Sequence, residues 1–318
     1  MKKWNDISVS EENSQRLSRL EAKKERLDQL RPFPSAVVNN IRESLDIEWI
    51  HSSNSIEGNT LTLKETQMVI QDGITVSGKT LREHFEAVNH KDAIEYIEQL
   101  ISPNYTLRER DVLNVHELIM DKIDKEFAGR LRNAGVRISG AQFLPPNARK
   151  VPDLLEELID WVANSQDFHP IVQAAIFHHR FVYIHPFFDG NGRTVRLLFN
   201  LLLMKEGYPP GIILASDRKR YYKALKDADQ GNLDKLLELT LQAVTRSTDI
   251  YLNNLEDIAG DFAPISDIVK EPAIPYGQEY VSLLARKGQI DAYKEGRVWF
   301  TSKDAITKYL KSKGKLKN

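Results

Sequence analysis

Twelve consecutive residues, His185 to Arg196, constrain this chain more than any other stretch of its 318 residues. They read His-Pro-Phe-Phe-Asp-Gly-Asn-Gly-Arg-Thr-Val-Arg and so join an imidazole, a carboxylate, two glycines and two arginines. Glycines let backbone N–H groups approach an anion closely. The apolar run that follows, Leu197 to Met204, predicts a helix whose positive end faces that anion. The stretch therefore predicts a phosphate site at a helix start, and the alternative is a polar loop that only caps a buried helix.

The side chains of the stretch suit different parts of phosphate chemistry. Arg193 and Arg196 are three residues apart and would share one face of the helix. Asp189 has the carboxylate that a divalent cation requires, and His185 has an imidazole that exchanges a proton near neutral pH. Together these groups are what a phosphate site needs.

Composition excludes several other classes of protein. The chain has no cysteine, which excludes disulfides, thiolate zinc sites and cysteine nucleophiles. Its net charge of −1 argues against a chain that is basic throughout and binds nucleic acid with its whole surface. The first residues lack the apolar core of a signal peptide, and the run at 197–204 is too short to cross a bilayer. We expect a cytoplasmic protein without membrane contact, and the sequence leaves the oligomeric state open, a homodimer included.

Helical periodicity dominates, so we expect a mainly α fold. Residues 10–31 predict a surface helix, and residues 36–57 predict a second helix that stops at Gly58-Asn59. Glycine and proline interrupt residues 124–152, and we expect a β-hairpin or an irregular flap there, at about residues 136–150. The pattern divides the chain into an N-terminal helical region, a catalytic core and a small C-terminal domain, at residues 1–105, 106–255 and 262–318.

The C-terminal segment has a pattern of its own. Its order of helix, strand, Glu-Gly turn, strand and helix predicts a winged helix-turn-helix domain. It holds 11 lysines and arginines against 6 acids, a net charge of +5. Arg286, Lys287 and Arg297 near the predicted wing make DNA contact one interpretation, and a protein docking module is the other.

The stretch from His185 to Arg196 resembles the signature of the Fic family, H-P-F-x-[D/E]-G-N-G-R-x-x-R, and matches it at every fixed position. The resemblance extends from about Trp49 to Leu241. It implies a Fic-type helical core that binds ATP with Mg²⁺ and transfers AMP to a hydroxyl group. The acceptor would be a Tyr, Ser or Thr side chain of a target protein or of the chain itself, and pyrophosphate would be released.

The resemblance also implies a role for each site residue. His185 would act as general base on the incoming hydroxyl, and Asp189 would hold Mg²⁺. The flap would clamp the target segment by strand addition. The residues that would bind ATP and its phosphates are Gly190, Asn191, Gly192, Arg193 and Arg196, with Tyr221 or Tyr222 beside the adenine.

A second feature of the family lies upstream, where Ser53-Asn54-Ser55-Ile56-Glu57-Gly58 resembles the inhibitory motif [S/T]-x-x-x-E-[G/N]. Ser53 and Glu57 are four apart and share a helix face. The resemblance implies that Glu57 pairs with Arg196 and blocks a productive γ-phosphate position. Two other functions stay open. The same site could run in reverse and remove AMP from a modified protein, or the chain could be a DNA-binding regulator whose nucleotide domain is a sensor.

Overall fold

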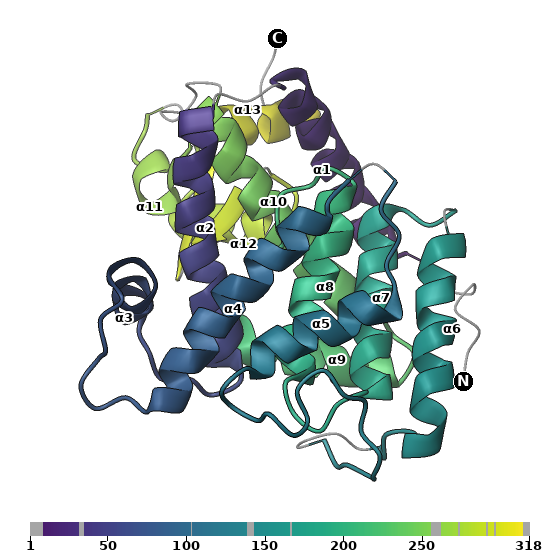
Figure 1. Cartoon of the computed structure of the whole chain (residues 1–318). Coiled ribbons are helices and arrows are strands. Elements are labelled where there is room, and N and C mark those ends of the chain that lie inside the picture. Colours follow the sequence, from purple (N-terminus) through teal and green to yellow (C-terminus); the bar gives the residue numbers. More distant parts are fainter. Residues whose placement is uncertain are drawn as a thin grey trace. The chain divides into compact units, whose positions relative to one another are not determined.

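The computed structural model of the chain is mainly helical, as predicted (Figure 1). The structure describes residues 9–31, 35–102, 104–138, 143–165, 167–255, 262–272, 274–290, 292–295 and 297–313.

Two compact units make up the described chain, and each is considered by itself. Unit 1 holds the described residues of 44–240, and unit 2 holds those of 9–43 and 241–313. This division differs from the three predicted segments, because the first helix of the chain groups with the C-terminal residues. Helices α2 and α10 each extend across the division.

Unit 1 is built around one buried helix, α8. This helix packs against α4, α5 and α7, and its residues from 193 to 203 are all buried. Its elements are the second half of α2 (Ser35–Ile56), α3 (Leu63–Gln67), the π-helix η2 (Met68–Asp72), α4 (Leu81–Leu100), α5 (Glu109–Met120), the 3-10 helix η3 (Ala148–Lys150), α6 (Val151–Asn164), α7 (Pro170–Ile184), α8 (Asn191–Lys205), the 3-10 helix η4 (Ala215–Asp217), α9 (Arg218–Asp229) and the start of α10 (Asp234–Leu255).

The predicted flap is a loop where the structure describes it. Residues 136–138 and 143–147 form no strand, so the hairpin prediction is wrong for them, and residues 139–142 lie outside the described chain. Arg132 explains the irregular path. Its guanidinium donates to the carbonyl oxygens of Ala134 and Pro146, at 3.0 and 2.6 Å. These carbonyls are satisfied by a side chain instead of by a neighbouring strand.

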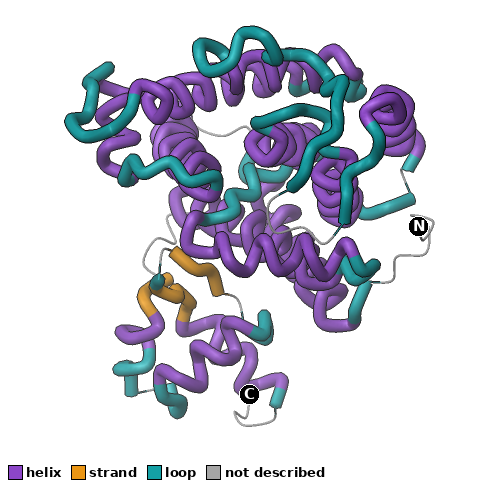
Figure 2. Tube along the Cα trace, turned by 90° about the horizontal axis from the view of Figure 1, so that it is seen from below, coloured by secondary structure: helices purple, strands orange, loops and turns teal. Residues whose placement is uncertain are grey.

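Unit 2 contains a three-stranded antiparallel sheet with the order β1-β3-β2 (Figure 2). The predicted strand–turn–strand is confirmed as β2 and β3, whereas β1 was not predicted. The winged-helix assignment and its DNA contact stay predictions. The elements are α1 (Glu11–Gln29), the first part of α2, the rest of α10, β1 (Phe262–Pro264), α11 (Ile265–Ile268), α12 (Gln278–Arg286), β2 (Ala292–Glu295), β3 (Val298–Ser302) and α13 (Lys303–Ser312).

Helix α1 is not the simple surface helix that its composition predicted. Its buried residues recur every three or four positions and include Leu20 and Leu27. Between them, the Lys23 ammonium binds both carboxylate oxygens of Asp249 on α10, at 2.7 and 2.9 Å, and both side chains are buried. A buried charge requires such a partner, so this pair fixes α1 within unit 2.

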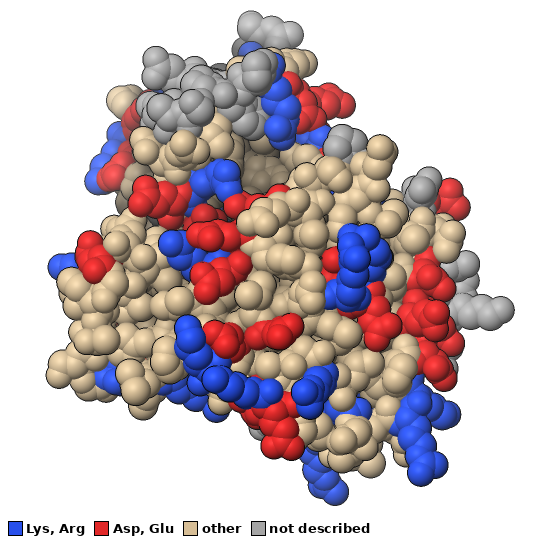
Figure 3. All heavy atoms as spheres, in the orientation of Figure 1, with Lys and Arg blue, Asp and Glu red and all other residues tan. Residues whose placement is uncertain are grey.

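Among the described residues, no helix has both the length and the apolar character needed to cross a membrane. On the face drawn in Figure 3, acidic and basic side chains are intermixed. This face shows no continuous surface of one charge.

Four histidines of unit 1 have pKa values that burial lowers, and this predicts an acid-sensitive fold. Burial lowers the pKa of His116 to about 4 and that of His178 to about 3. It lowers the pKa of His185 to about 4 and also that of His90, which lies beside two arginines. Below the ordinary histidine value near 6.5, the unfolded chain therefore binds more protons than the folded chain.

We predict that the free energy of unfolding falls as pH drops from 6.5 toward 4. Each of these histidines contributes a slope of up to about 1.4 kcal/mol per pH unit in this window. Urea unfolding at pH 7.5, 6.5 and 5.5 measures the effect. The midpoint should fall slightly between the first two values and more steeply toward the third, and an unchanged midpoint at pH 5.5 would contradict the prediction.

Candidate functional site

The candidate site lies where α7 ends and α8 begins. His185 follows α7 with φ 51° and ψ 63°, a left-handed conformation that stops the helix. Gly190 has φ 74° and directly precedes the first turn of α8. Because α8 starts at Asn191, its first backbone N–H groups have no acceptor within the helix and are available to an anion.

The loop between the two helices is held from inside and from α5. The Asn191 side chain accepts from the Phe187 N–H at 3.0 Å and donates to the Phe187 carbonyl at 2.9 Å. The His116 ring stacks on the Phe187 ring with 3.6 Å between centroids. Its Nδ1 accepts from the Gly129 N–H at 3.0 Å, so its Nε2 donates to the Asp189 carbonyl at 3.1 Å. Asn191 thus shapes the loop, and its expected contact with an anion would use the second hydrogen of its amide.

Arg132 holds the other side of the same loop and is buried. Its Nε donates to the carbonyl of His185 at 2.7 Å, and its backbone N–H donates to the carbonyl of Pro186 at 2.9 Å. Together with its contacts to Ala134 and Pro146, Arg132 ties the site loop to the flap.

His185 is placed as a neutral base. Its Nδ1 lies 3.3 Å from the carbonyl oxygen of Val182, which can only accept, so this nitrogen carries the proton and Nε2 does not. Burial lowers the pKa of His185 to about 4, against the opposing effects of the Val182 carbonyl and of two carboxylates. The ring is therefore neutral at physiological pH and its Nε2 is free to accept a proton.

The structure joins Arg196 to the upstream motif at the end of α2. Nε of Arg196 donates to the Ser53 hydroxyl at 3.0 Å, and Nη2 donates to the Ser53 carbonyl and to Oε1 of Glu57, both at 2.8 Å. Arg196 is 3% exposed, whereas the Glu57 side chain is 34% exposed. The same Glu57 oxygen touches the position that a Cβ on Gly192 would occupy. Glu57 therefore lies over the start of α8, where an anion would bind.

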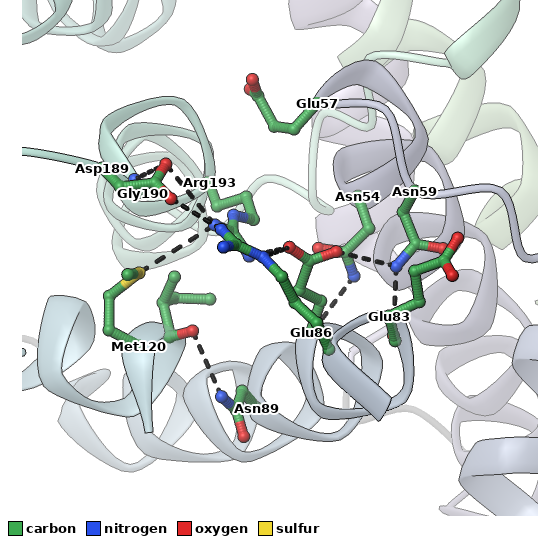
Figure 4. Close-up of polar contacts among 12 residues, drawn as sticks. Asn54, Glu57, Asn59, Glu83, Glu86, Asn89, Met120, Asp189, Gly190 and Arg193 are labelled. Atoms are coloured by element: carbon green, nitrogen blue, oxygen red, sulfur yellow. Dashed lines mark hydrogen bonds and ion pairs between the residues drawn. The ribbon is translucent and has the colours of Figure 1, made fainter. Parts of the chain in front are cut away.

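Asp189 and Arg193 are each paired with a residue of α4 (Figure 4). The Arg82 guanidinium donates to Oδ2 of Asp189 at 2.7 Å. Nη1 of Arg193 lies 3.3 Å from Oε1 of Glu86. Burial alone would raise the pKa of Asp189, but Arg193, the Gly190 N–H and Arg82 outweigh it and hold this pKa below its ordinary value.

The Asp189 carboxylate fits a bound Mg²⁺. In nucleotide sites this ion uses one or two carboxylates and completes its shell with water and phosphate oxygens. Asp189 is ionised, its side chain is 53% exposed, and it already faces two cationic groups, the guanidinium groups of Arg82 at 2.7 Å and of Arg193 at 3.9 Å. No set of three acidic or imidazole side chains among the described residues forms a metal site by itself, so nucleotide and water would supply the other ligands.

The two neighbouring tyrosines differ in exposure. Tyr221 is 1% exposed, and its hydroxyl lies 2.8 Å from Nε2 of His178, so its ring is part of the core. Tyr222 is 39% exposed, and its hydroxyl contacts the Ile56 carbonyl at 3.3 Å and Oε2 of Glu57 at 3.5 Å. Only Tyr222 of this pair offers a ring face to a ligand.

Four residues around the loop were not predicted from the sequence: Arg82, Glu86, His116 and Arg132. Each comes from a segment far from the motif in the chain. Arg82 and Glu86 share a helix face at a spacing of four, a signal that usually marks only a solvated ion pair.

The comparisons with known proteins agree with this architecture. Residues 106–203 match the sequence model of the Fic/DOC family. The chain contains a Fic domain and is a Fic domain protein.

Similar proteins extend the match beyond that domain. The chain is 33% identical over 248 residues to the protein adenylyltransferase Fic of Drosophila willistoni, covering 77% of this chain and 49% of that protein. It is 35% identical over 237 residues to the protein of that name from Aedes aegypti, covering 72% and 47%. The chain thus spans about half the length of the curated relatives it matches.

Solved structures show the same fold. Fic-1 (residues 134–508) from C. elegans superposes with a TM-score of 0.69 at 29% identity, over 76% of this chain and 72% of that one. A Fic family protein from Desulfovibrio desulfuricans G20 superposes with a TM-score of 0.64 at 25% identity, over 93% and 97%.

We predict that Arg132→Ala lowers the free energy of unfolding by about 3 kcal/mol or more, because a hydrogen bond to a charged group contributes about 1.5–3 kcal/mol. Arg132→Lys should recover only part of the loss, since an ammonium cannot reproduce the planar fork. Urea unfolding measures both variants. The exposed Arg137→Ala is the control and should stay within about 0.5 kcal/mol. Equal stability of the two alanine variants would contradict the role assigned to Arg132.

Proposed function

We propose that this chain is a protein adenylyltransferase that transfers AMP from ATP to a Tyr, Ser or Thr hydroxyl of a target protein or of itself, and that Glu57 restrains it. The observation that carries the proposal is the Arg196 guanidinium, held by Glu57 at the start of α8. The names of the similar proteins support the reaction class.

The transfer would use the groups of the site as follows. Nε2 of His185 takes the proton of the acceptor hydroxyl as its oxygen attacks the α-phosphorus, and the bond from that phosphorus to the bridging oxygen breaks. The amides at the start of α8 stabilise the negative charge on the α-phosphate, and one such donor contributes roughly 3 kcal/mol. Arg193 and Arg196 bind the β- and γ-phosphates, which leave as pyrophosphate.

Asp189 is proposed to hold Mg²⁺ on the phosphates, where the ion would neutralise charge on the leaving group. Tyr222 is proposed to pack on the adenine because its ring is exposed next to Glu57. We propose the flap as the place where the target segment docks. There, Leu144 is 70% exposed, and the Phe143 ring stacks on that of Tyr183 with 4.7 Å between centroids.

Restraint by Glu57 would follow from shared use of Arg196. The same guanidinium cannot hold Glu57 and a γ-phosphate in one geometry, so the pair favours unproductive nucleotide binding. A bias of roughly 2.7 kcal/mol keeps about 99% of molecules inactive. Removal of AMP from a modified protein is the second candidate reaction, favoured by the position of the Glu57 carboxylate over the start of α8, where it would orient a water.

Three smaller proposals concern the setting of this activity. DNA contact by the C-terminal residues is supported by the exposure of Arg286, Lys287 and Arg297. A cytoplasmic location is proposed as the setting that the sequence favours. A homodimer would be one means of controlling Glu57.

We predict that Glu57→Gly raises incorporation of labelled AMP into the chain or lysate proteins roughly 10–100-fold, because it frees Arg196. Glu57→Gln should activate less, since its amide still reaches Arg196. Incubation with α-labelled ATP and Mg²⁺ measures the effect. The proposal fails if Glu57→Gly binds ATP normally and labels nothing. Loss of AMP hydrolysis from a modified protein in the same variant would favour the reverse reaction.

We predict that His185→Ala, made together with Glu57→Gly, lowers the rate of AMP transfer about 10²–10⁴-fold, as loss of a general base does. ATP affinity should stay within twofold of the parent's, or about 0.4 kcal/mol.

Because burial keeps the pKa of His185 at about 4, its neutral form persists far below pH 6.5. The pH profile of transfer in the Glu57→Gly parent should therefore lack an acid limb near 6.5, and a limb at that pH would contradict this assignment.

A further inference from the structure

Arg82 and Glu86 form a charged pair on one face of α4, and each contacts one residue of the motif. Figure 4 shows the contact of Glu86 with Arg193. Nε of Arg82 lies 3.2 Å from Oε1 of Glu86. Nη2 of Arg82 binds Oδ2 of Asp189 at 2.7 Å, and Oε1 of Glu86 lies 3.3 Å from Nη1 of Arg193. The four side chains form one connected cluster of two cations and two anions.

This cluster has an inner, buried half, Arg193 with Glu86, and an outer, exposed half, Arg82 with Asp189. The Arg193 side chain is 3% exposed and that of Glu86 is 12% exposed. Arg82 and Asp189 are 55% and 53% exposed. A buried guanidinium needs a counter-ion, so Glu86 stabilises Arg193 in the absence of a ligand. The outer pair is in contact with water and is weak enough to be exchanged.

Arg193 is only loosely bound by its carboxylate. Its Nε and Nη1 are buried and have no hydrogen-bond partner among the residues that the structure describes. The pair with Glu86 is thus a contact between charges without a well-directed hydrogen bond. These donors stay available for the oxygens of a phosphate, which a guanidinium binds in a directed, bidentate way.

Glu86 is fixed from its other side by the segment around the proposed inhibitory motif. Its Oε2 accepts from Nδ2 of Asn59 at 2.9 Å, and its backbone carbonyl accepts from Nδ2 of Asn54 at 3.1 Å. Asn54 and Asn59 lie on either side of Glu57 in the chain. The carboxylate that contacts Arg193 is therefore anchored by the same segment that carries the carboxylate that contacts Arg196.

We propose that Arg82 and Glu86 are positioning residues that hold Asp189 and Arg193 in the nucleotide-free protein, and that a metal–nucleotide complex must displace both contacts. Arg82 binds Oδ2 of Asp189, a carboxylate oxygen that a metal ion would use, and Glu86 lies against Nη1 of Arg193, a donor that a β-phosphate would use. This inference rests on the proposed function for the identity of the ligands. It adds a second point of restraint, on α4, to that of Glu57, which directly follows α2.

Metal binding tests the outer half directly. We would titrate Mn²⁺, a paramagnetic substitute for Mg²⁺, into the Glu57→Gly protein and follow loss of the free-ion EPR signal, with and without the ATP analogue AMP-PNP. Arg82→Gln should lower the Mn²⁺ concentration at half-saturation about 1.5–5-fold, the range expected for loss of an exposed ion pair. Lys91→Gln, which removes an exposed cation from the same helix, should leave it unchanged. Asp189→Asn should abolish the specific binding.

An unchanged or higher Mn²⁺ requirement in Arg82→Gln would overturn the proposal. The titration without AMP-PNP reads the Arg82–Asp189 contact even if the nucleotide does not bind. Failure of AMP-PNP to bind the Glu57→Gly protein would instead count against the proposed function.

Nucleotide binding without metal tests the inner half. Glu86→Gln removes the charge that opposes a phosphate but keeps an oxygen for Asn59. The dissociation constant of AMP-PNP should fall several-fold in this variant, and the control Glu95→Gln, on the same helix, should not change it. A purely structural role for Glu86 predicts the opposite, because a misplaced Arg193 would bind phosphate less well. A weaker affinity in Glu86→Gln would therefore overturn this half of the proposal.

Discussion

A guanidinium buried at the start of α8 is the constraint on which the site depends. Arg196 is almost fully removed from water, and a charge in that position costs several kcal/mol unless it is paired. The Ser53 hydroxyl and carbonyl and the Glu57 carboxylate meet this need. The end of α2 is thereby attached to the helix that carries the motif. Any ligand that binds Arg196 must offer it an equally good anion.

The same principle divides the site into fixed and exchangeable parts. His116 and Asn191 hold the loop through neutral side chains, and the Arg132 guanidinium holds it through backbone carbonyls, so a nucleotide has no carboxylate to displace at these contacts. The arginines of the motif are held by carboxylates, for which phosphates are natural substitutes. Regulation and catalysis would then use the same two arginines. A stronger ion pair between an arginine and its carboxylate must therefore weaken nucleotide binding in the productive geometry.

The parts of the site that depend on neighbouring residues in the chain could be predicted from the sequence. The helix start after Gly190 and the end of α2 before Glu57 follow from residue types within a few positions. Arg132 could not be found in this way, because its four acceptors are backbone carbonyls that carry no residue signature. The flap was misjudged for the same reason, since alternation at 136–139 predicts a strand only if a partner strand exists. The grouping of α1 with α10 depends on Lys23 and Asp249, a contact across 226 positions.

The most direct test of the shared Arg196 is a pair of crystal structures with AMP-PNP and Mg²⁺, of the wild-type chain and of Glu57→Gly. The account predicts that Arg196 stays on Glu57 in the wild type, with the terminal phosphate directed elsewhere. In Glu57→Gly, the guanidinium should bind the terminal phosphate. A wild-type complex in which Arg196 binds Glu57 and the terminal phosphate together, with the α-phosphate beside His185, would contradict it.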